Sequence, residues 1–174
     1  MKKFFFLTFF CFFYSNASAD KNIVYLDVNF IITQSEAGKY INNELQKFNK
    51  KNIEEFKKIE ASIKSEEESL LKQKNIIKEE EFNKKANDLK EKYKSYQKLK
   101  SNKNNKLKKI RDNAGNKILK IINDILAKYS NENKISLIME KKNIVIGKSE
   151  LDITNDILSL LNAKIKKVEI SNEW

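Results

Sequence analysis

Cysteine, histidine and proline are nearly absent from this chain. Its 174 residues include one cysteine, Cys11, and neither histidine nor proline. Residues 20–174 therefore cannot form a disulfide within the chain, and they lack the side chains that most often bind transition metals, form nucleophile–base pairs or sense pH. No glycine-rich phosphate loop or dinucleotide fingerprint is present. These absences predict a protein that is not an enzyme and that uses no cofactor and no metal.

The sequence also lacks an apolar run long enough to cross a membrane. Its longest apolar stretch covers residues 4–14, whereas a spanning helix needs about 20 residues. Lys2 and Lys3 precede this stretch, and the small-residue pattern at 17–19 follows it. This order is typical of a bacterial signal peptide over residues 1–19, cleaved before Asp20. The mature chain is therefore expected in the periplasm.

Acidic residues are scarce in one part of the chain. Of the 35 basic and 24 acidic residues, 25 basic and 15 acidic ones lie within 36–131. Residues 64–92 carry eight of each sign, so they are neutral, whereas 92–111 contain nine Lys or Arg and no acid. Eight residues of this run form what we call the basic belt: Lys94, Lys98, Lys100, Lys103, Lys106, Lys108, Lys109 and Arg111. Such a run is typical of a nucleic-acid or membrane surface, although nucleic acid is not an expected partner of an exported protein.

Apolar residues recur with heptad spacing through the second half of this charged region. Steps of four and three from residue 82 predict a helical seam at Phe82, Ala86, Leu89, Tyr93, Tyr96, Lys100, Lys103, Leu107, Ile110, Ala114, Lys117 and Ile121. An upstream segment has the same spacing at Phe56, Ile59, Ile63 and Leu70. Two seams of this kind predict coiled-coil packing of two helices.

The two segments can be folded against each other in one antiparallel register. Pairs such as Phe56 with Tyr96 and Leu70 with Phe82 share a constant sum of residue numbers, which predicts helices over 36–74 and 79–131 with the turn near 75–78. Ser35 is the expected N-cap of the first helix. The same register places Gly38 opposite Gly115, which leaves either a close helix approach or a flexible point. It also places Asn49 opposite Lys103 and Asn52 opposite Lys100, so the seam is expected to be polar and pliable at mid-arm.

The two ends of the chain predict a small β body. Residues 22–28 have strand character, and Asp27 is the expected cap of a helical turn through Thr33. Further strands are predicted at 135–140 and 143–147, a short helix capped by Thr154 and running through Ala163, and a last strand at 164–170. The fold class is therefore α+β and predominantly α. A hairpin arm over 35–131 projects from a body made of 20–34 and 132–174.

A body this small buries too little surface to be stable alone, so oligomerisation is expected. The candidate oligomerisation residues are Ile23, Tyr25, Leu137, Ile138, Ile144 and Ile146.

The order of these elements resembles the Skp/OmpH family of periplasmic chaperones. The resemblance covers the strand "NIVYLDVNFII", the charged hairpin, the strands "SLIMEKKNIVIG" and the terminal "LDITNDILSLLN". It implies a homotrimer whose arms enclose a cavity, and an ATP-independent holdase that binds unfolded outer-membrane proteins and prevents their aggregation. On this interpretation the basic belt is the client-binding surface of a positive cavity. Tyr93 and Tyr96 are expected to pack in the seam.

The same lysine run leaves a second interpretation open. A structural or surface-binding coiled coil would use it to attach to anionic lipid or lipopolysaccharide. A nucleic-acid binder would use it too, but only if the signal peptide were retained.

Overall fold

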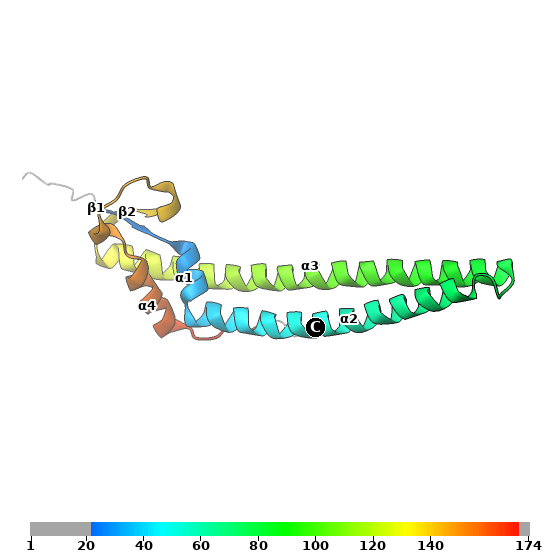
Figure 1. Ribbon diagram of the computed structural model, residues 1–174. Coiled ribbons are helices and arrows are strands. Elements are labelled where there is room, and N and C mark those ends of the chain that lie inside the picture. The colour runs from blue at the N-terminus through cyan, green and yellow to red at the C-terminus, as the bar shows by residue number, and fades with distance from the viewer. Residues whose placement is uncertain (1–21, 171–174) are drawn as a thin grey trace, which may run out of the picture.

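The computed structural model describes residues 22–170. The expected signal peptide, with its cleavage site before Asp20, lies outside the described residues. Two long antiparallel helices form an arm that projects from a small body at its base (Figure 1). Helix α2 spans Glu36–Gln73 and helix α3 spans Glu79–Glu132. The chain thus reverses between residues 74 and 78, and the predicted helical hairpin is confirmed.

Local sequence explains where the arm helices begin. The hydroxyl of Ser35, which is fully buried, accepts a hydrogen bond from the Gly38 amide at 3.0 Å and caps α2 as expected. Three glutamates, Glu79 to Glu81, occupy the first turn of α3, where the positive end of the helix dipole favours anions.

The predicted register is observed in the outer half of the arm. The rings of Phe56 and Tyr96 pack edge to face, with centroids 6.0 Å apart. Both are buried, together with Ile63, and Leu89 packs against the same cluster. The predicted pairing of Phe56 with Tyr96 is therefore confirmed.

Closer to the body the seam departs from the heptad prediction. Ile118 and Ile122 are fully buried, whereas the predicted seam residue Lys117 is exposed and Ile121 is only half-buried. In the outer arm, Tyr93 is 52% exposed and does not lie in the seam. An unsupercoiled helix with 3.6 residues per turn drifts about 20° per heptad, so a strict 3.5-residue seam loses register along a helix this long.

Between the two apolar clusters the arm contains no buried residue. On α2 none of the residues between Leu45 and Phe56 is buried, and on α3 none between Tyr96 and Ile110. The gap on α2 corresponds to about 15 Å of helix. This is the polar mid-arm segment that the register predicted, and it separates the outer arm from the core at the base.

The body packs around the base of the arm. Strand β1 (Asn22–Leu26) pairs in parallel with β2 (Ile135–Glu140), and the two form a two-stranded sheet. Helix α1 (Val28–Gln34) is capped by Asp27, whose side chain accepts from the Phe30 amide at 2.8 Å. Helix α4 (Thr154–Lys164) lies against α1 and α3 (Figure 1). The core joins β1, α1, α3 and α4 through fully or almost fully buried side chains: Leu26, Ile31, Ile118, Ile122, Ile157 and Leu161.

Three predictions for the body are wrong. Residues 143–147 form no strand: after the 3-10 turn η1 (Lys141–Asn143) the chain continues as a loop to η2 (Ser149–Leu151). Residues 164–170 form no strand either. Thr154 is the first residue of α4 rather than its cap, because its hydroxyl accepts from the Asp27 amide at 2.9 Å and ties α4 to β1.

Gly38 and Gly115 do not bring the arm helices together. A Cβ on Gly38 would lie 1.7 Å from the Ile32 carbonyl oxygen, so this glycine allows α1, not α3, to approach α2. A Cβ on Gly115 would meet nothing within 4 Å. Within residues 22–170, none of the helices is both long and apolar enough to span a bilayer.

Candidate functional site: the arm and the outer face of the body

The structure divides the basic belt into tethered and unpaired cations, all on α3. Lys94 pairs with Glu91 one turn earlier, at 2.6 Å. Lys100 reaches Glu60 on α2 at 3.6 Å, and Lys103 pairs with Glu55 on α2. The other five belt residues make no ion pair or hydrogen bond through their side chains within residues 22–170: Lys98, Lys106, Lys108, Lys109 and Arg111.

Two of the tethered lysines, Lys100 and Lys103, belong to a cluster in the outer half of the arm whose other members are Phe56, Glu60 and Tyr96. The Tyr96 hydroxyl donates to the Glu60 carboxylate, and the Lys100 ammonium lies 5.6 Å from the centre of the Tyr96 ring and 5.9 Å from that of Phe56. The hydrogen bond from Tyr96 lowers the pKa of Glu60, and the hydrogen bond to Glu60 raises the pKa of Tyr96. Two of the predicted belt residues thus join the helices of the arm.

The arm carries a groove on each flank of Leu107. One groove, of ≈ 230 Å³, has Leu45 and Leu107 as its apolar floor. We call it the amide-lined groove, because its walls are Asn42, Gln46, Asn49, Asn104, Lys108 and Arg111. The other, of ≈ 360 Å³, we call the ion-paired groove. Its walls are Phe48, Lys51, Asn52, Glu55, Lys103 and Lys106.

The two grooves differ in whether an acidic side chain lines them. The ion-paired groove contains the Glu55–Lys103 pair, and its Lys51 ammonium lies 5.7 Å from the centre of the Phe48 ring. The amide-lined groove contains two cations and no acid. The prediction from sequence found Lys108 and Arg111 by charge but assigned none of the four amides to a binding site, because a single Asn or Gln in a lysine- and asparagine-rich chain carries no signal; Asn49 was expected only as a polar residue of the seam. The available sign was that the three amides on α2, Asn42, Gln46 and Asn49, follow one another at intervals of four and three residues along one face of the helix.

On the body, the predicted oligomerisation residues fall into two groups. Ile23, Leu137 and Ile146 are 45%, 49% and 92% exposed, whereas Tyr25 is buried. Ile138 and Ile144 are half-buried. Val145, which the sequence prediction omitted, is fully exposed. The apolar residues that the fold leaves in solvent therefore include two consecutive ones in the loop after β2.

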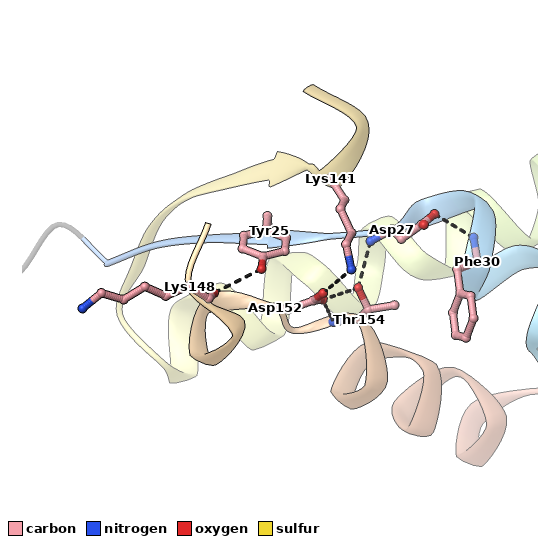
Figure 2. A network of polar contacts seen from close by, with 7 residues as sticks. All are labelled: Tyr25, Asp27, Phe30, Lys141, Lys148, Asp152 and Thr154. Carbon is pink, nitrogen blue, oxygen red and sulfur yellow. Dashed lines mark hydrogen bonds and ion pairs between the residues drawn. The ribbon is translucent and has the colours of Figure 1, made fainter. Parts of the chain in front are cut away.

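Figure 2 shows that this loop is fixed against β1 by polar contacts. The Tyr25 hydroxyl donates to the Lys148 carbonyl at 3.1 Å, and the Lys141 ammonium binds the Asp152 carboxylate at 2.7 Å. Gly147 passes so close to the Tyr25 ring that a Cβ would lie 2.8 Å from a ring carbon. Asp152 also accepts from the Thr154 amide at 3.0 Å. Val145 and Ile146 are thus presented to solvent by a loop that is held on both sides.

Burial raises the pKa of the Asp152 carboxyl, but the hydrogen bonds from Lys141 and Thr154 outweigh it and the net shift is downward. In the folded protein the Asp152 carboxyl is therefore ionised at any pH above its ordinary pKa of 3.8. Among residues 22–170, no group of three or more acidic, cysteine or histidine side chains is arranged to bind a metal ion.

Comparison with known proteins agrees with this architecture. A solved structure from Caulobacter crescentus, described as a candidate outer membrane chaperone (OmpH-like), matches with a TM-score of 0.75 and 16% identity, over 85% of this chain and 88% of that one. At this identity the likeness shows the fold. No curated protein sequence matches the chain. The model of the family described as outer membrane protein (OmpH-like) matches residues 22–161, and the chain therefore belongs to the OmpH-like family.

Proposed function

We propose that this protein is an ATP-independent holdase of the periplasm, which binds unfolded outer-membrane proteins and prevents their aggregation. The observation that carries the proposal is the unpaired positive charge on the arm of an OmpH-like fold. Lys98, Lys106, Lys108, Lys109 and Arg111 have no acidic partner among residues 22–170. A holdase acts by mass action on the unfolded client, so it needs no catalytic residue.

Such contacts suit reversible binding. An exposed ion pair contributes only about 0.2–1 kcal/mol, and at 0.15 M salt charges are screened beyond about 8 Å. Many weak contacts spread over a long arm would retain a client and still release it. Apolar groove floors such as Leu45 and Leu107 would add contact area for the client's apolar side chains.

Client binding in a cavity requires several arms, and we propose a homotrimer assembled through the body. Exposed Ile23, Leu137, Val145 and Ile146 support an interface there. Within residues 22–170, β2 pairs only with β1, so its other edge presents unpaired backbone groups that a strand of another copy could bind. The segment proposed to pair there is 143–147, which has strand-like composition but pairs with no strand within residues 22–170.

A substitution in the loop after β2 tests whether the body forms the proposed homotrimer. The Ile146→Asp variant should lose the oligomer in sedimentation equilibrium, because it places a charge in the proposed interface. Ile76→Asp is the matched control, since Ile76 is 80% exposed at the arm turn, far from the body. An Ile146→Asp variant with unchanged mass would exclude this interface.

The holdase function is tested by diluting a urea-denatured β-barrel protein from the outer membrane into buffer with and without the chain. Aggregation, followed by light scattering, should be suppressed at about three copies per client without nucleotide. Replacing the five unpaired cations with Gln should weaken suppression, and added salt should have the same effect on the unmodified protein. If scattering is unchanged while the chain pellets with anionic vesicles, the alternative of a lipid-binding coiled coil is favoured.

A further inference from the structure

The two grooves on either side of Leu107 are lined by different kinds of side chain. On the amide-lined side, Asn42, Gln46, Asn49 and Asn104 make no side-chain hydrogen bond within residues 22–170. These amides are exposed, and they surround an apolar floor in which Leu45 is buried. The groove therefore combines free donors, free acceptors and an apolar surface in one place.

The charge of this groove is also unbalanced. Lys108 and Arg111, one turn apart on α3, line it and have no ion pair within residues 22–170. No aspartate or glutamate lines the groove. The ion-paired groove has its own acid, Glu55, bound to Lys103. The ion-paired side also has lysines without an ion pair, Lys51 and Lys106, but of the two grooves only the amide-lined one combines unpaired cations with free amides and no acid that would repel an external carboxylate.

From these observations we propose that the amide-lined groove binds extended segments of unfolded polypeptide that carry a carboxylate. This inference rests on the proposed holdase function and assigns it a binding site. A side-chain amide offers both a donor and an acceptor, and so does each peptide unit of an extended chain. Amide contacts to backbone carry no sequence preference, Arg111 can bind a carboxylate in a bidentate manner, and the leucine floor accepts an apolar side chain.

The dimensions suit a short segment. From Asn42 to Asn49 the α2 wall rises about 10 Å, which is the length of about three residues of extended chain. One groove therefore binds weakly. Repetition of the groove in an oligomer would raise the overall affinity through multivalency.

A phosphate-bearing lipid headgroup would satisfy this groove less well. Phosphate oxygens accept hydrogen bonds, so the four amide carbonyls would gain no donor from them. The apolar floor would also stay uncovered by the headgroup. Polypeptide is therefore the ligand that matches all three features of the site.

Site-specific cross-linking tests which flank the client touches. The only cysteine of the chain, Cys11, lies in the expected signal peptide, so each mature variant would carry a single thiol. Asn49→Cys and Asn104→Cys place a benzophenone label on the amide-lined side, and Asn52→Cys places it on the ion-paired side. With a urea-denatured outer-membrane β-barrel protein as probe, yields at 49 and 104 should exceed those at 52 at least five-fold. Equal yields, or a higher yield at 52, would overturn the proposal.

A charge-matched pair of double variants gives the second measurement. Lys108→Gln/Arg111→Gln removes two charges from the amide-lined groove, whereas Lys84→Gln/Lys90→Gln removes two exposed charges from the outer part of α3, outside both grooves and the basic belt. Client affinity should fall about 3- to 10-fold in the first at low salt, as expected for two exposed ion pairs, and less than two-fold in the second.

Equal losses in the two double variants would reject the groove while leaving the holdase function in place. A loss of binding to anionic vesicles in the first variant, with client affinity unchanged, would identify the groove as a lipid site instead and overturn the proposal. Absence of client binding by the unmodified protein would instead reject the holdase function itself.

Discussion

Replacing Phe56 by Ala should open the outer arm without unfolding the body. Phe56 is 8% exposed and packs with Tyr96 and Ile63 in a cluster that the polar mid-arm segment separates from the core at the base. Truncation of a fully buried Phe costs about 3–5 kcal/mol. Because water can refill the space in a two-helix arm, we expect a cost below this range, about 2–3 kcal/mol.

This cost should appear in local opening of the arm, measured by hydrogen exchange and mass spectrometry. A loss of about 2–3 kcal/mol raises the opening constant roughly 30- to 150-fold, which should accelerate exchange in residues 57–73 and 82–99. Peptides covering 118–125, which hold the fully buried Ile118 and Ile122, should keep their protection.

The control for this experiment is Ile53→Ala, because Ile53 is 43% exposed on the adjacent part of α2 and should change exchange little. Equal acceleration in residues 118–125 would show that arm and body unfold as one unit. That result would refute the division of the hydrophobic core at mid-arm.

Three further predictions concern the base of the arm and the body. Gly38→Ala should destabilise the protein by about 1–3 kcal/mol in urea unfolding, because the new Cβ would collide with the Ile32 carbonyl. Gly115→Ala should be neutral or stabilising by up to about 1 kcal/mol, since it improves helix propensity in open space, and a cost as large as that of Gly38→Ala would contradict the geometry. Because the folded-state pKa of Asp152 is lowered, its ionised carboxylate stabilises the protein at pH values above the ordinary pKa of 3.8. This stabilisation is lost as the pH falls through the lower pKa of the folded state. Lys141→Gln should reduce this acid-dependent loss in urea titrations at a series of pH values, and an unchanged pH profile would show that the ion pair does not fix the loop.

Large apolar residues made the hairpin predictable. The pairing of Phe56 with Tyr96 and a single constant register located the turn to within about one residue. The heptad pattern failed further from the turn because the helix keeps its own period, so Ile118 replaced Lys117 in the seam. Short segments of sequence determine local pairing well, but small angular errors accumulate along a helix of this length.

The body was less predictable because strands need partners as well as propensity. Residues 143–147 have the β-branched composition of a strand, yet within the described chain they lie as a loop beside Tyr25. Thr154 is a typical N-cap residue, but its hydroxyl accepts a hydrogen bond from the Asp27 amide instead. Both outcomes depend on contacts between segments more than 100 residues apart, which local patterns do not contain.

The candidate site was predicted only in part. Charge identified the basic belt but could not separate Lys100 and Lys103, which bind glutamates of α2, from the unpaired Lys108 and Arg111. That distinction depends on which face of α3 meets α2, and it emerged only from the packed hairpin.

The most direct test of the central claim is native mass spectrometry of the chain mixed with an unfolded outer-membrane β-barrel protein. The claim is that unpaired cations on the arms of an assembled body retain an unfolded client. It predicts a complex of three chains and one client that forms without nucleotide and dissociates as salt is raised. A monomeric chain, or a trimer that acquires no client at low salt, would contradict it.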